Sequence, residues 1–393
     1  MKVLHWYTNF LGGGGVANAV LGLAQAQACL GVDAAIASAE PQGQPLYEAM
    51  DDIRGVQMIR WKPHWRIRFS GLVLRGIPRQ TAAALQAFKP DVVHMHGEFN
   101  PDNLWVPRLF RCLLVLSPHG AFHPVVLTKS KSWLKKLYFH VASRMLYRHV
   151  DAFHALSPAE QNHILFLLPR KTVYCAPQGP NVRVVNQAYM SEEVSCSIRR
   201  RGPVAFVFVG RLDTFTKGLD ILLDAFAEVL RRHPEIQLRL VLAGPDWCGS
   251  MEQLKERVRR LQIEEVVGLT GPLKGKEVSR LFKDADIYVH LSRHEGFPLS
   301  IVEALLHGKP AILSDRIGTV SYQEVRSLPH VAVVQPAVED AASAMTDFVS
   351  RLDELSIQAR QHVGQMREFF SWHRVARLHV EAYEHVSRSV KKD

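Results

Sequence analysis

The sequence predicts an α/β protein of two doubly wound domains, each built on a parallel sheet with helices on both faces. The chain has 393 residues, more than the ~250–300 at which a single hydrophobic core stops growing, so two cores are expected. Short apolar runs suited to buried strands alternate with amphipathic runs suited to helices, a pattern typical of parallel sheets. The alternation stops at a polar stretch near residues 180–203 and then begins again, which separates the two domains.

The predicted strands are short apolar runs, and helical runs lie between them. In the first half we expect strands at residues 3–8, 32–38, 91–97, 113–120, 151–157 and 172–179, and helices at residues 16–31 and 132–148. In the second half we expect strands at residues 204–210, 238–244, 266–271, 286–292, 310–315 and 331–336, and helices at residues 218–233, 253–262, 277–285 and 301–308. Because doubly wound sheets bind ligands at the carboxyl ends of their strands, we expect the site in a cleft between the domains.

Composition is that of a soluble globular protein. Hydrophobic residues make up 47% and charged residues 22% of the sequence, which excludes the disordered and fibrous classes. The five cysteines are scattered and form no C-x-x-C pair, which argues against a disulfide framework and a zinc site. The first residues lack the apolar core of a signal peptide, and no window reaches the ~20 apolar residues of a spanning helix. We therefore expect a cytoplasmic protein.

Positive charge gathers in the first half of the chain. The net charge is +10, and residues 1–180 hold 19 Lys and Arg against 10 Asp and Glu, whereas residues 181–393 hold 29 against 28. This asymmetry predicts an anionic partner for the first half. The sequence has no zinc-finger, homeodomain or RNP-like signature, so a membrane surface or a phosphorylated acceptor is a better candidate than nucleic acid.

Two segments of the first half mix cations with aromatic residues and predict peripheral contact with an anionic membrane. Residues 60–69 read RWKPHWRIRF, and residues 129–138 contain Lys129, Lys131, Trp133, Lys135, Lys136 and Tyr138. Trp and Tyr favour the membrane–water interface, and basic residues are attracted to an anionic leaflet. The alternative is a solvated basic face with Trp61, Trp65 and Trp133 packed inward.

A run of four glycines, residues 12–15, follows the first predicted strand and opens the first predicted helix. Backbone N–H groups and the positive end of a helix can bind phosphate at such a turn. The nearest match to the dinucleotide motif G-x-G-x-x-G fails at Asn18, although Glu40 could serve as its ribose-binding acid. A nicotinamide or flavin site, or a flexible turn without a ligand, stays as an alternative.

Arg211 and Lys217 lie in the loop between the first predicted strand and helix of the second half, directly after Gly210. An arginine can fork onto phosphate oxygens and a lysine acts as a point charge, so the pair suits a departing nucleoside diphosphate. Solvated surface charge is the alternative interpretation.

Glu295 and Glu303 are separated by seven residues in the run HEGFPLSIVE. Glu295 follows a predicted strand, whereas Glu303 lies about two turns into the next helix, and at about 1.5 Å per residue both can reach one ligand. The backbone N–H groups of residues 296–299 begin that helix and offer a further anion-binding surface. An ordinary helix start with a loop acid is the alternative.

Two other groups of residues invite a metal-binding interpretation. Asp284 and Asp286 form a D-x-D pair, but they stand at a helix-to-strand junction where Asp is common, so we expect a structural role. His94 and His96 are expected to alternate along a strand end, so that only one faces the site and a metal lacks further ligands. His119 is the better functional candidate, with a packed or hydrogen-bonded structural role as its alternative.

Four segments together resemble the family 4 group of retaining glycosyltransferases with the GT-B fold. They read GRLDTFTKGLDILLDAF, VLAGP, HEGFPLSIVEALLHGKPAILSD and FSWHRVARLHVEAY. SPHGAFHP and ALSPAEQ in the first half resemble members that build bacterial surface polysaccharides, so the likeness runs the length of the chain. It implies two Rossmann-like domains with an interdomain cleft: residues 1–180 for the acceptor, a linker at 181–202, residues 203–370 for the nucleotide sugar, and a helix at 371–393 that crosses back to the first domain.

The resemblance also implies roles for individual residues. Arg211 and Lys217 would bind the donor diphosphate, Glu303 the ribose hydroxyls, and Glu295 the donor sugar, with His119 facing the transferred sugar. The expected catalytic residues are Glu295, His119, Arg211 and Lys217. The expected donor-binding residues are Gly14, Gly15, Gly210, Arg211, Lys217, Glu295, Gly296, Phe297, Pro298, Leu299 and Glu303. Two cations and helix starts can neutralise the leaving diphosphate, so neither a metal nor another cofactor is expected.

The chain departs from the family pattern in one loop of the donor half. Many relatives have a close glycine pair and a nearby Glu after the strand expected at residues 310–315. Here residues 315–322 intervene before Glu324, so the base and phosphate contacts of this loop stay open.

The expected function is retaining transfer of a sugar from a UDP- or GDP-sugar to an acceptor, a lipid-linked glycan of bacterial exopolysaccharide or lipopolysaccharide biosynthesis. The expected location is the cytoplasm, peripheral on the cytosolic face of the inner membrane. One alternative is a GT-B sugar-nucleotide epimerase, which would need further acid and base carboxylates. The other is a catalytically silent scaffold that binds nucleotide sugar, against which the retention of Arg211, Lys217, Glu295 and Glu303 argues.

Overall fold

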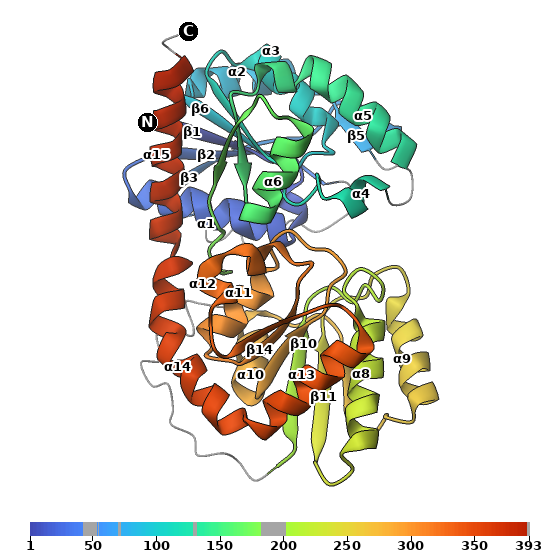
Figure 1. Ribbon diagram of the computed structural model, residues 1–393. Coiled ribbons are helices and arrows are strands. Elements are labelled where there is room, and N and C mark those ends of the chain that lie inside the picture. Colours follow the sequence, from blue (N-terminus) through green and yellow to red (C-terminus); the bar gives the residue numbers. More distant parts are fainter. Residues whose placement is uncertain (42–52, 54, 70–71, 129–131, 182–201, 391–393) are drawn as a thin grey trace. The chain divides into compact units, whose positions relative to one another are not determined.

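The computed structural model describes residues 1–41, 53, 55–69, 72–128, 132–181 and 202–390 (Figure 1). The chain divides into two compact units, the first made of Met1–Gly179 with Ser371–Asp393 and the second of Pro180–Phe370. Most of the predicted linker, residues 182–201, lies outside the described residues. Each unit has a parallel sheet covered by helices, which confirms the predicted α/β class.

The first unit is built on a parallel sheet whose seven described strands follow the order β3-β2-β1-β6-β7-β8-β9. Their bounds are β1 (Lys2–Trp6), β2 (Asp33–Ala39), β3 (Val56–Trp61), β6 (Val92–His96), β7 (Leu113–Ser117), β8 (Ala152–Ala155) and β9 (Thr172–Cys175). A separate antiparallel hairpin of β4 (Arg66–Phe69) and β5 (Leu72–Arg75) is not among the predicted elements. The register places His5 of β1 beside His94 of β6.

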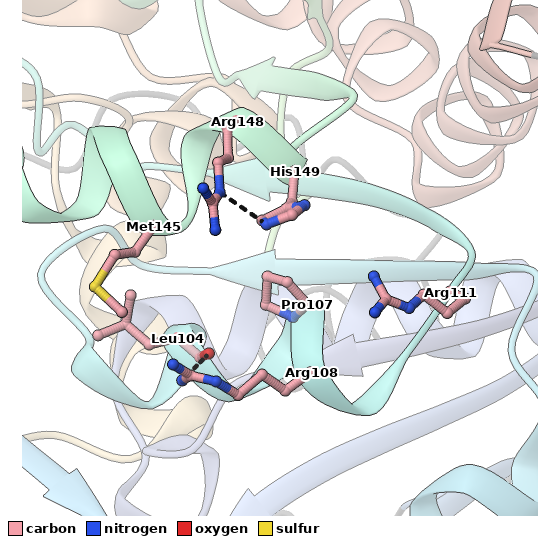
Figure 2. A pocket seen from close by; sticks show the side chains of 7 residues that line it. All are labelled: Leu104, Pro107, Arg108, Arg111, Met145, Arg148 and His149. Atoms are coloured by element: carbon pink, nitrogen blue, oxygen red, sulfur yellow. Dashed lines mark hydrogen bonds between the residues drawn. The ribbon is translucent and has the colours of Figure 1, made fainter.

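Helices cover both faces of the first sheet (Figure 1). They are α1 (Gly15–Cys29), α2 (Arg79–Phe88), α3 (Val106–Leu109), α4 (Pro124–Thr128), α5 (Ser132–Met145), α6 (Pro158–Leu167) and α15 (Trp372–Val390), with the 3-10 helices η1 (Phe10–Gly12), η3 (Pro101–Trp105) and η4 (Tyr147–His149). The last helix, α15, packs on the first unit, where Tyr383 and Val386 join a cluster with Val3. A small pocket opens beside α3 and η4 (Figure 2).

The second unit has a parallel sheet whose six described strands follow the order β12-β11-β10-β13-β14-β15. Their bounds are β10 (Val204–Val209), β11 (Leu238–Ala243), β12 (Val267–Thr270), β13 (Ile287–His290), β14 (Ala311–Ser314) and β15 (Val331–Val334). The helices are α8 (Leu219–Arg232), α9 (Ser250–Leu261), α10 (Gly275–Asp284), α11 (Leu299–Leu306), η5 (Gly318–Ser321), α12 (Gln323–Arg326), α13 (Val338–Ser350) and α14 (Leu352–Phe369). Of these, η5, α12, α13 and α14 are not among the predicted helices.

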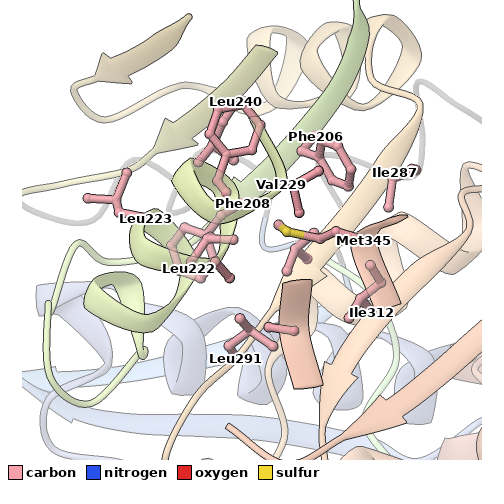
Figure 3. Packing of buried hydrophobic residues seen from close by; sticks show 14 of the residues in the cluster. Phe206, Phe208, Leu222, Leu223, Val229, Leu240, Ile287, Leu291, Ile312 and Met345 are labelled. Atoms are coloured by element: carbon pink, nitrogen blue, oxygen red, sulfur yellow. The ribbon is translucent and has the colours of Figure 1, made fainter. Parts of the chain in front are cut away.

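The core of the second unit explains why its first helix forms. Leu219, Leu222, Phe226 and Val229 recur at helical spacing, so one face of α8 is apolar and becomes buried. Figure 3 shows Leu222 and Val229 meeting the aromatic side chains of β10 and the side chain of Met345 from α13. Burial of this face fixes where β10 ends and α8 begins, and therefore fixes the loop between them.

Candidate functional site

The strand order of each sheet reverses beside its first strand, between β1 and β6 in the first unit and between β10 and β13 in the second. Doubly wound sheets bind ligands at the carboxyl ends of the strands next to such a reversal. The glycine run follows β1, Arg211 and Lys217 follow β10, and Glu295 follows β13. The topology of each unit therefore brings its candidate residues to the expected edge of the sheet.

Lys217 and Glu295 form an ion pair that joins the loops after β10 and β13. Glu295 Oε2 also accepts hydrogen bonds from His290 Nε2 at 2.9 Å and from Ser292 Oγ at 3.0 Å. Burial alone would raise the pKa of Glu295, but Lys217 and His290 outweigh burial and hold that pKa well below its usual range. Glu295 is therefore an ionised, oriented carboxylate, and sequence reasoning missed its partners His290 and Ser292.

The loop that carries Lys217 is held from several directions. Asp213 Oδ1 accepts the N–H of Thr216 at 2.9 Å. Arg293 donates two hydrogen bonds of 2.7 Å each to the carboxylate of Asp220, at the start of α8. Gly218 has a left-handed backbone, and a Cβ there would come within 2.1 Å of the Leu291 carbonyl oxygen. Lys217 is therefore placed by a rigid turn and is only 8% exposed.

Glu303 lies in α11 and is buried, with its carboxylate accepting a hydrogen bond from the backbone N–H of Asn181. Burial raises the pKa of Glu303 to about 8, and the Asn181 contact only partly offsets it. No described cation forms an ion pair with this carboxyl. A buried carboxyl with so little compensation is suited to receive hydroxyl donors from a ligand.

Arg211 is the exposed cation of the predicted pair. Its guanidinium stacks over the ring of Trp247 at 4.0 Å from the centroid, and its Nη2 lies 3.5 Å from Asp213 Oδ2. Trp247 follows β11 and is 45% exposed, and no sequence signal singled it out. Gly210, beside Arg211, touches the next strand end closely, because a Cβ on Gly244 would fall 1.8 Å from the Gly210 carbonyl oxygen.

Residues 296–299 connect Glu295 to α11. Phe297 is buried and makes edge-on contacts with Tyr322 and Phe370. Pro298 directly precedes the first turn of α11, which begins at Leu299 and has no side-chain cap. The first N–H groups of α11 are therefore not capped by a side chain.

The loop that departs from the family pattern pairs with the Glu295 loop. Gly318 donates its backbone N–H to the Glu295 carbonyl oxygen at 2.8 Å, and Glu295 and Ile317 form a β-bridge. Glu324 lies in the first turn of α12. The loop that departs from the family pattern therefore helps to position the backbone of Glu295.

The glycine run of the first unit forms a turn that faces open space. Gly13 and Gly14 have φ of 74° and 97°, which side-chain-bearing residues rarely adopt. A Cβ on Gly14 would meet no atom within 4 Å, and neither would one on Gly12 or Gly15. Helix α1 begins at Gly15 without a side-chain cap, so this turn has room for a ligand beside a helix start.

A hydrogen-bonded chain of histidines crosses one face of the first sheet. His119 Nε2 lies 3.2 Å from His96 Nδ1, His96 Nε2 lies 3.0 Å from His5 Nδ1, and His5 Nε2 lies 2.8 Å from Gln27 Oε1. Because Gln27 Oε1 can only accept, neutral rings must each donate through Nε2 toward Gln27. The Nδ1 atom of His119 then accepts from Gln178 Nε2 at 3.2 Å.

The chain of hydrogen bonds continues from Gln27 along the same face of the sheet. Gln27 Nε2 contacts Tyr383 Oη at 3.5 Å, and Tyr383 Oη contacts His94 Nδ1 at 2.6 Å. Ser117 Oγ then bridges His94 Nε2 at 2.5 Å and His154 Nδ1 at 2.6 Å. His154 Nε2 ends the chain on the Ala176 carbonyl oxygen at 3.0 Å, which can only accept. The acceptor oxygens of Gln27 and Ala176 therefore both require every ring of the chain to carry its proton on Nε2. All the hydrogen bonds then donate in one direction, from Gln178 toward Ala176.

Burial keeps these histidines neutral. It lowers the pKa of His5 and His154 to about 4 and that of His119 to about 3. It also holds the pKa of His94 and of His96 well below the usual range, and neighbouring histidines add to the effect. His119 also has a left-handed backbone, with φ of 54°. Both ring nitrogens of His119 form hydrogen bonds, which fits the structural role that the sequence leaves as the alternative for this residue.

The prediction that the side chains of His94 and His96 alternate between the two faces of the strand is wrong. Residues two apart on a strand share a face, and the two rings stack with centroids 4.3 Å apart. With His5 they bring three ring nitrogens within 4.8 Å of one another, so further ligands are present. The near-parallel rings, tilted by only 25°, cannot aim in-plane lone pairs at one ion ~2.0–2.1 Å away. The arrangement suits hydrogen bonding better than metal binding.

Asp284 and Asp286 have structural partners. Asp284 ends α10, and Asp286 Oδ2 accepts the N–H of Ala205 at 2.8 Å. This contact joins the start of β10 to the segment before β13.

The two basic segments are placed only in part. Trp61 is 3% exposed and its ring lies beside that of Trp6, so the inward alternative holds for Trp61. Trp65 and Trp133 are 37% and 63% exposed. Lys129 and Lys131 lie outside the described residues, as do the side chains of Lys135 and Lys136. In the described parts of the chain, no helix is long and apolar enough to span a bilayer.

Comparison with known families matches both halves of the chain. The model of the Glycosyl transferase 4-like domain matches residues 14–176, and the model of Glycosyl transferases group 1 matches residues 197–362. The chain belongs to the family 4 glycosyltransferases. The complex of Anabaena Alr3699/HepE with UDP and glucose shares the GT-B fold of this glycosyltransferase, with a TM-score of 0.70 at 17% identity over 98% of this chain and 100% of that one.

Two curated relatives illustrate the range of the family. The glycosyltransferase is 30% identical over 181 residues to mannosylfructose-phosphate synthase of Agrobacterium fabrum, a match of 43% of this chain and 39% of that protein. It is 29% identical over 282 residues to the GDP-mannose:cellobiosyl-diphosphopolyprenol alpha-mannosyltransferase of Xanthomonas campestris. This match covers 68% of this chain and 70% of that protein. Over the first relatives, the match spans about two fifths to one half of their length.

Proposed function

We propose that this family 4 glycosyltransferase transfers a sugar from a nucleoside diphosphate sugar to a lipid-linked glycan, with retention of anomeric configuration and without a metal. The observation that carries the proposal is the Lys217–Glu295 pair at the strand reversal of the second unit, with Glu303 in the helix that follows. A cation, an oriented carboxylate and a buried carboxyl at one sheet edge are the groups that a sugar diphosphate requires.

The leaving diphosphate develops negative charge as the glycosidic bond breaks, so its stabilisation dominates the chemistry. Lys217 and Arg211 would supply the positive charge that compensates it, and the uncapped start of α11 would add N–H donors. Glu295, ionised and held by His290 and Ser292, would accept hydrogen bonds from the hydroxyls of the donor sugar. Glu303 would accept those of the ribose.

The acceptor side of the proposal rests on the first unit. The open glycine turn has room for a sugar or phosphate beside the start of α1. His119 is neutral and hydrogen-bonded through both nitrogens, so its proposed role is to position the backbone facing the sugar, not to transfer a proton. The Xanthomonas campestris relative is named for a diphosphopolyprenol acceptor, which supports a lipid-diphosphate glycan as the acceptor.

Donor class and reaction type can be tested in two steps. A thermal-shift screen with UDP, GDP and ADP identifies the base, because binding to the folded state alone raises its stability. Consumption of the matching nucleotide sugars is then followed with and without lipid-diphosphate glycans. Acceptor-dependent transfer supports the proposal. Epimerised nucleotide sugar would identify an epimerase, and binding without any turnover would identify a silent scaffold.

A further inference from the structure

A pocket of about 260 Å³ lies at the amino-terminal edge of the first sheet, the edge opposite to the glycine turn. It is lined by Leu104, Pro107, Arg108, Arg111, Met145, Arg148 and His149 (Figure 2). Arg111 stands just before β7, and Arg148 stands just before β8, so the two parallel strand starts bring these arginines together. The volume suits a small polar group, since pockets for drug-sized ligands hold about 300–1,000 Å³.

The cations of this pocket are not neutralised by acids. No described carboxylate forms an ion pair with Arg108, Arg111 or Arg148. Arg108 donates to the Leu104 carbonyl oxygen at 3.2 Å, and Arg148 Nε donates to His149 Nε2 at 3.0 Å. Three arginines that line one pocket and have no described carboxylate partner suit an anion with several oxygens, such as a phosphate.

The surroundings strengthen the positive field. Lys171 donates to the Val150 carbonyl oxygen at 2.9 Å, beside His149. The nearby acid Asp151 is engaged, because its Oδ2 accepts the N–H of Leu114 at 2.8 Å. Desolvation, then Arg148, Arg111 and Lys171, lower the pKa of His149. A neutral His149 can accept the hydrogen bond that orients Arg148.

An exposed apolar stripe on α5 leads into the pocket. Trp133, Leu137, Val141 and Met145 recur every fourth residue, so they lie along one side of the helix. Their exposed fractions are 63%, 50%, 38% and 39%, although side chains of this kind are usually covered. Met145 belongs to both features, because it ends the stripe and lines the pocket.

We propose that the α5 stripe and the arginine pocket form one docking surface for an anionic lipid bilayer, with the pocket holding a headgroup phosphate. A stripe that begins with Trp suits the membrane–water interface, and cations at its end suit the phosphate layer. The charge of the pocket favours an anionic bilayer over an apolar protein partner. The proposal rests on the lipid-acceptor part of the proposed function, whereas donor binding does not depend on it. Because the pocket lies at the sheet edge opposite to the glycine turn, it would hold a lipid of the bilayer and not the acceptor itself.

The test is co-sedimentation with vesicles of phosphatidylcholine alone or mixed with phosphatidylglycerol, at low and high salt. We expect the wild-type chain to bind the anionic vesicles at least tenfold more tightly, with weaker binding in high salt. Arg108→Gln/Arg111→Gln/Arg148→Gln and, separately, Trp133→Ser/Leu137→Ser should each lower that binding at least tenfold. The matched control, Arg259→Gln/Arg260→Gln/Arg280→Gln, removes the same charge from exposed positions of the second unit and should bind like wild type.

Unchanged melting temperature and nucleotide-induced thermal shift in every variant show that the fold and the donor site are intact, so failure of docking is distinguishable from failure of the proposed function. Equal binding to both vesicle types would overturn the proposal. Undiminished binding by the pocket variant would also overturn it, as would an equal loss in the control, because net charge alone would then explain the result. If glycerol 1-phosphate bound at the pocket while the chain bound no vesicles, the pocket would instead be assigned to a soluble phosphate.

Discussion

Lys217 and Glu295 are 78 residues apart in the chain and form a largely buried ion pair across two strand ends of the second sheet. The pair keeps a carboxylate ionised where burial opposes ionisation. A sugar diphosphate that reaches this edge would meet the cation and the carboxylate already fixed in place. Such preorganisation lowers the cost of stabilising the charge that develops on the leaving group.

Replacing either partner should therefore affect both stability and turnover. Lys217→Ala leaves Glu295 with only His290 and Ser292, so we expect a lower melting temperature and a transfer rate reduced about 10²–10³-fold. Glu295→Gln should lower turnover more than donor affinity. The double variant should be less than additive, because the two changes remove one interaction. Additive losses in a double-mutant cycle of steady-state kinetics and thermal unfolding would contradict this coupling.

Glu303→Gln should change how stability depends on pH. The folded-state pKa of about 8 lies above the usual value of 4.5, so the folded chain holds a proton that the unfolded chain releases between those values. Stability contributed by this group is therefore lost as the pH rises from about 4.5 to about 8. The variant lacks this loss, so its melting temperature relative to wild type should rise across that window. A pH-independent difference would show that the Glu303 carboxyl is not desolvated.

The same substitution should weaken donor binding. In the proposed donor site an ionised Glu303 would accept ribose hydroxyls through charge-assisted bonds, whose loss would cost roughly 1.5–3 kcal/mol. Wild-type affinity for the nucleotide should also increase as the pH rises toward 8, since ribose favours the ionised carboxyl. Calorimetric titration of both chains from pH 6 to 9 checks this, and equal affinities throughout would remove Glu303 from the donor site.

Local motifs made the position of the candidate donor residues in the fold predictable. Arg211, Lys217 and Glu295 lie in loops that follow strands, and parallel strands end at one edge, so spacing along the chain was enough to place them at the same edge of the sheet. The histidine chain could not be found in this way, because His5, Gln27 and Tyr383 come from separate elements and meet only through strand register and helix packing. The error at His94 and His96 came from assigning opposite faces to positions that share one.

The histidine chain predicts a single pattern of tautomers. His5, His94, His96, His119 and His154 should each carry the proton on Nε2 and stay neutral near pH 7, because burial lowers the pKa of every one of them well below its usual range. Nitrogen chemical shifts in ¹⁵N-histidine-labelled protein report the tautomer directly. Ser117→Ala should remove the bridge between His94 and His154 and cost about 1–3 kcal/mol of unfolding free energy. Mixed tautomers in the wild-type protein would contradict the one-directional chain.

Charge neutralisation of the diphosphate should not need a metal. Arg211→Ala should lower the transfer rate strongly, whereas EDTA should leave wild-type turnover within about twofold, since Arg211 and Lys217 supply the positive charge. Arg231→Ala is a matched control, because Arg231 is an exposed arginine of α8 whose partner is Glu228. Strict dependence on Mg²⁺ or Mn²⁺ would reopen the assignment of Asp284 and Asp286.

The most direct test of the central claim is the anomeric configuration of the product, followed by NMR with the nucleotide sugar that matches the base found by thermal shift and a lipid-diphosphate glycan. We predict acceptor-dependent transfer in which the new linkage keeps the configuration of the donor, and loss of that product in Lys217→Ala. An inverted linkage, or wild-type product formation by Lys217→Ala, would contradict retaining transfer at the Lys217–Glu295 site.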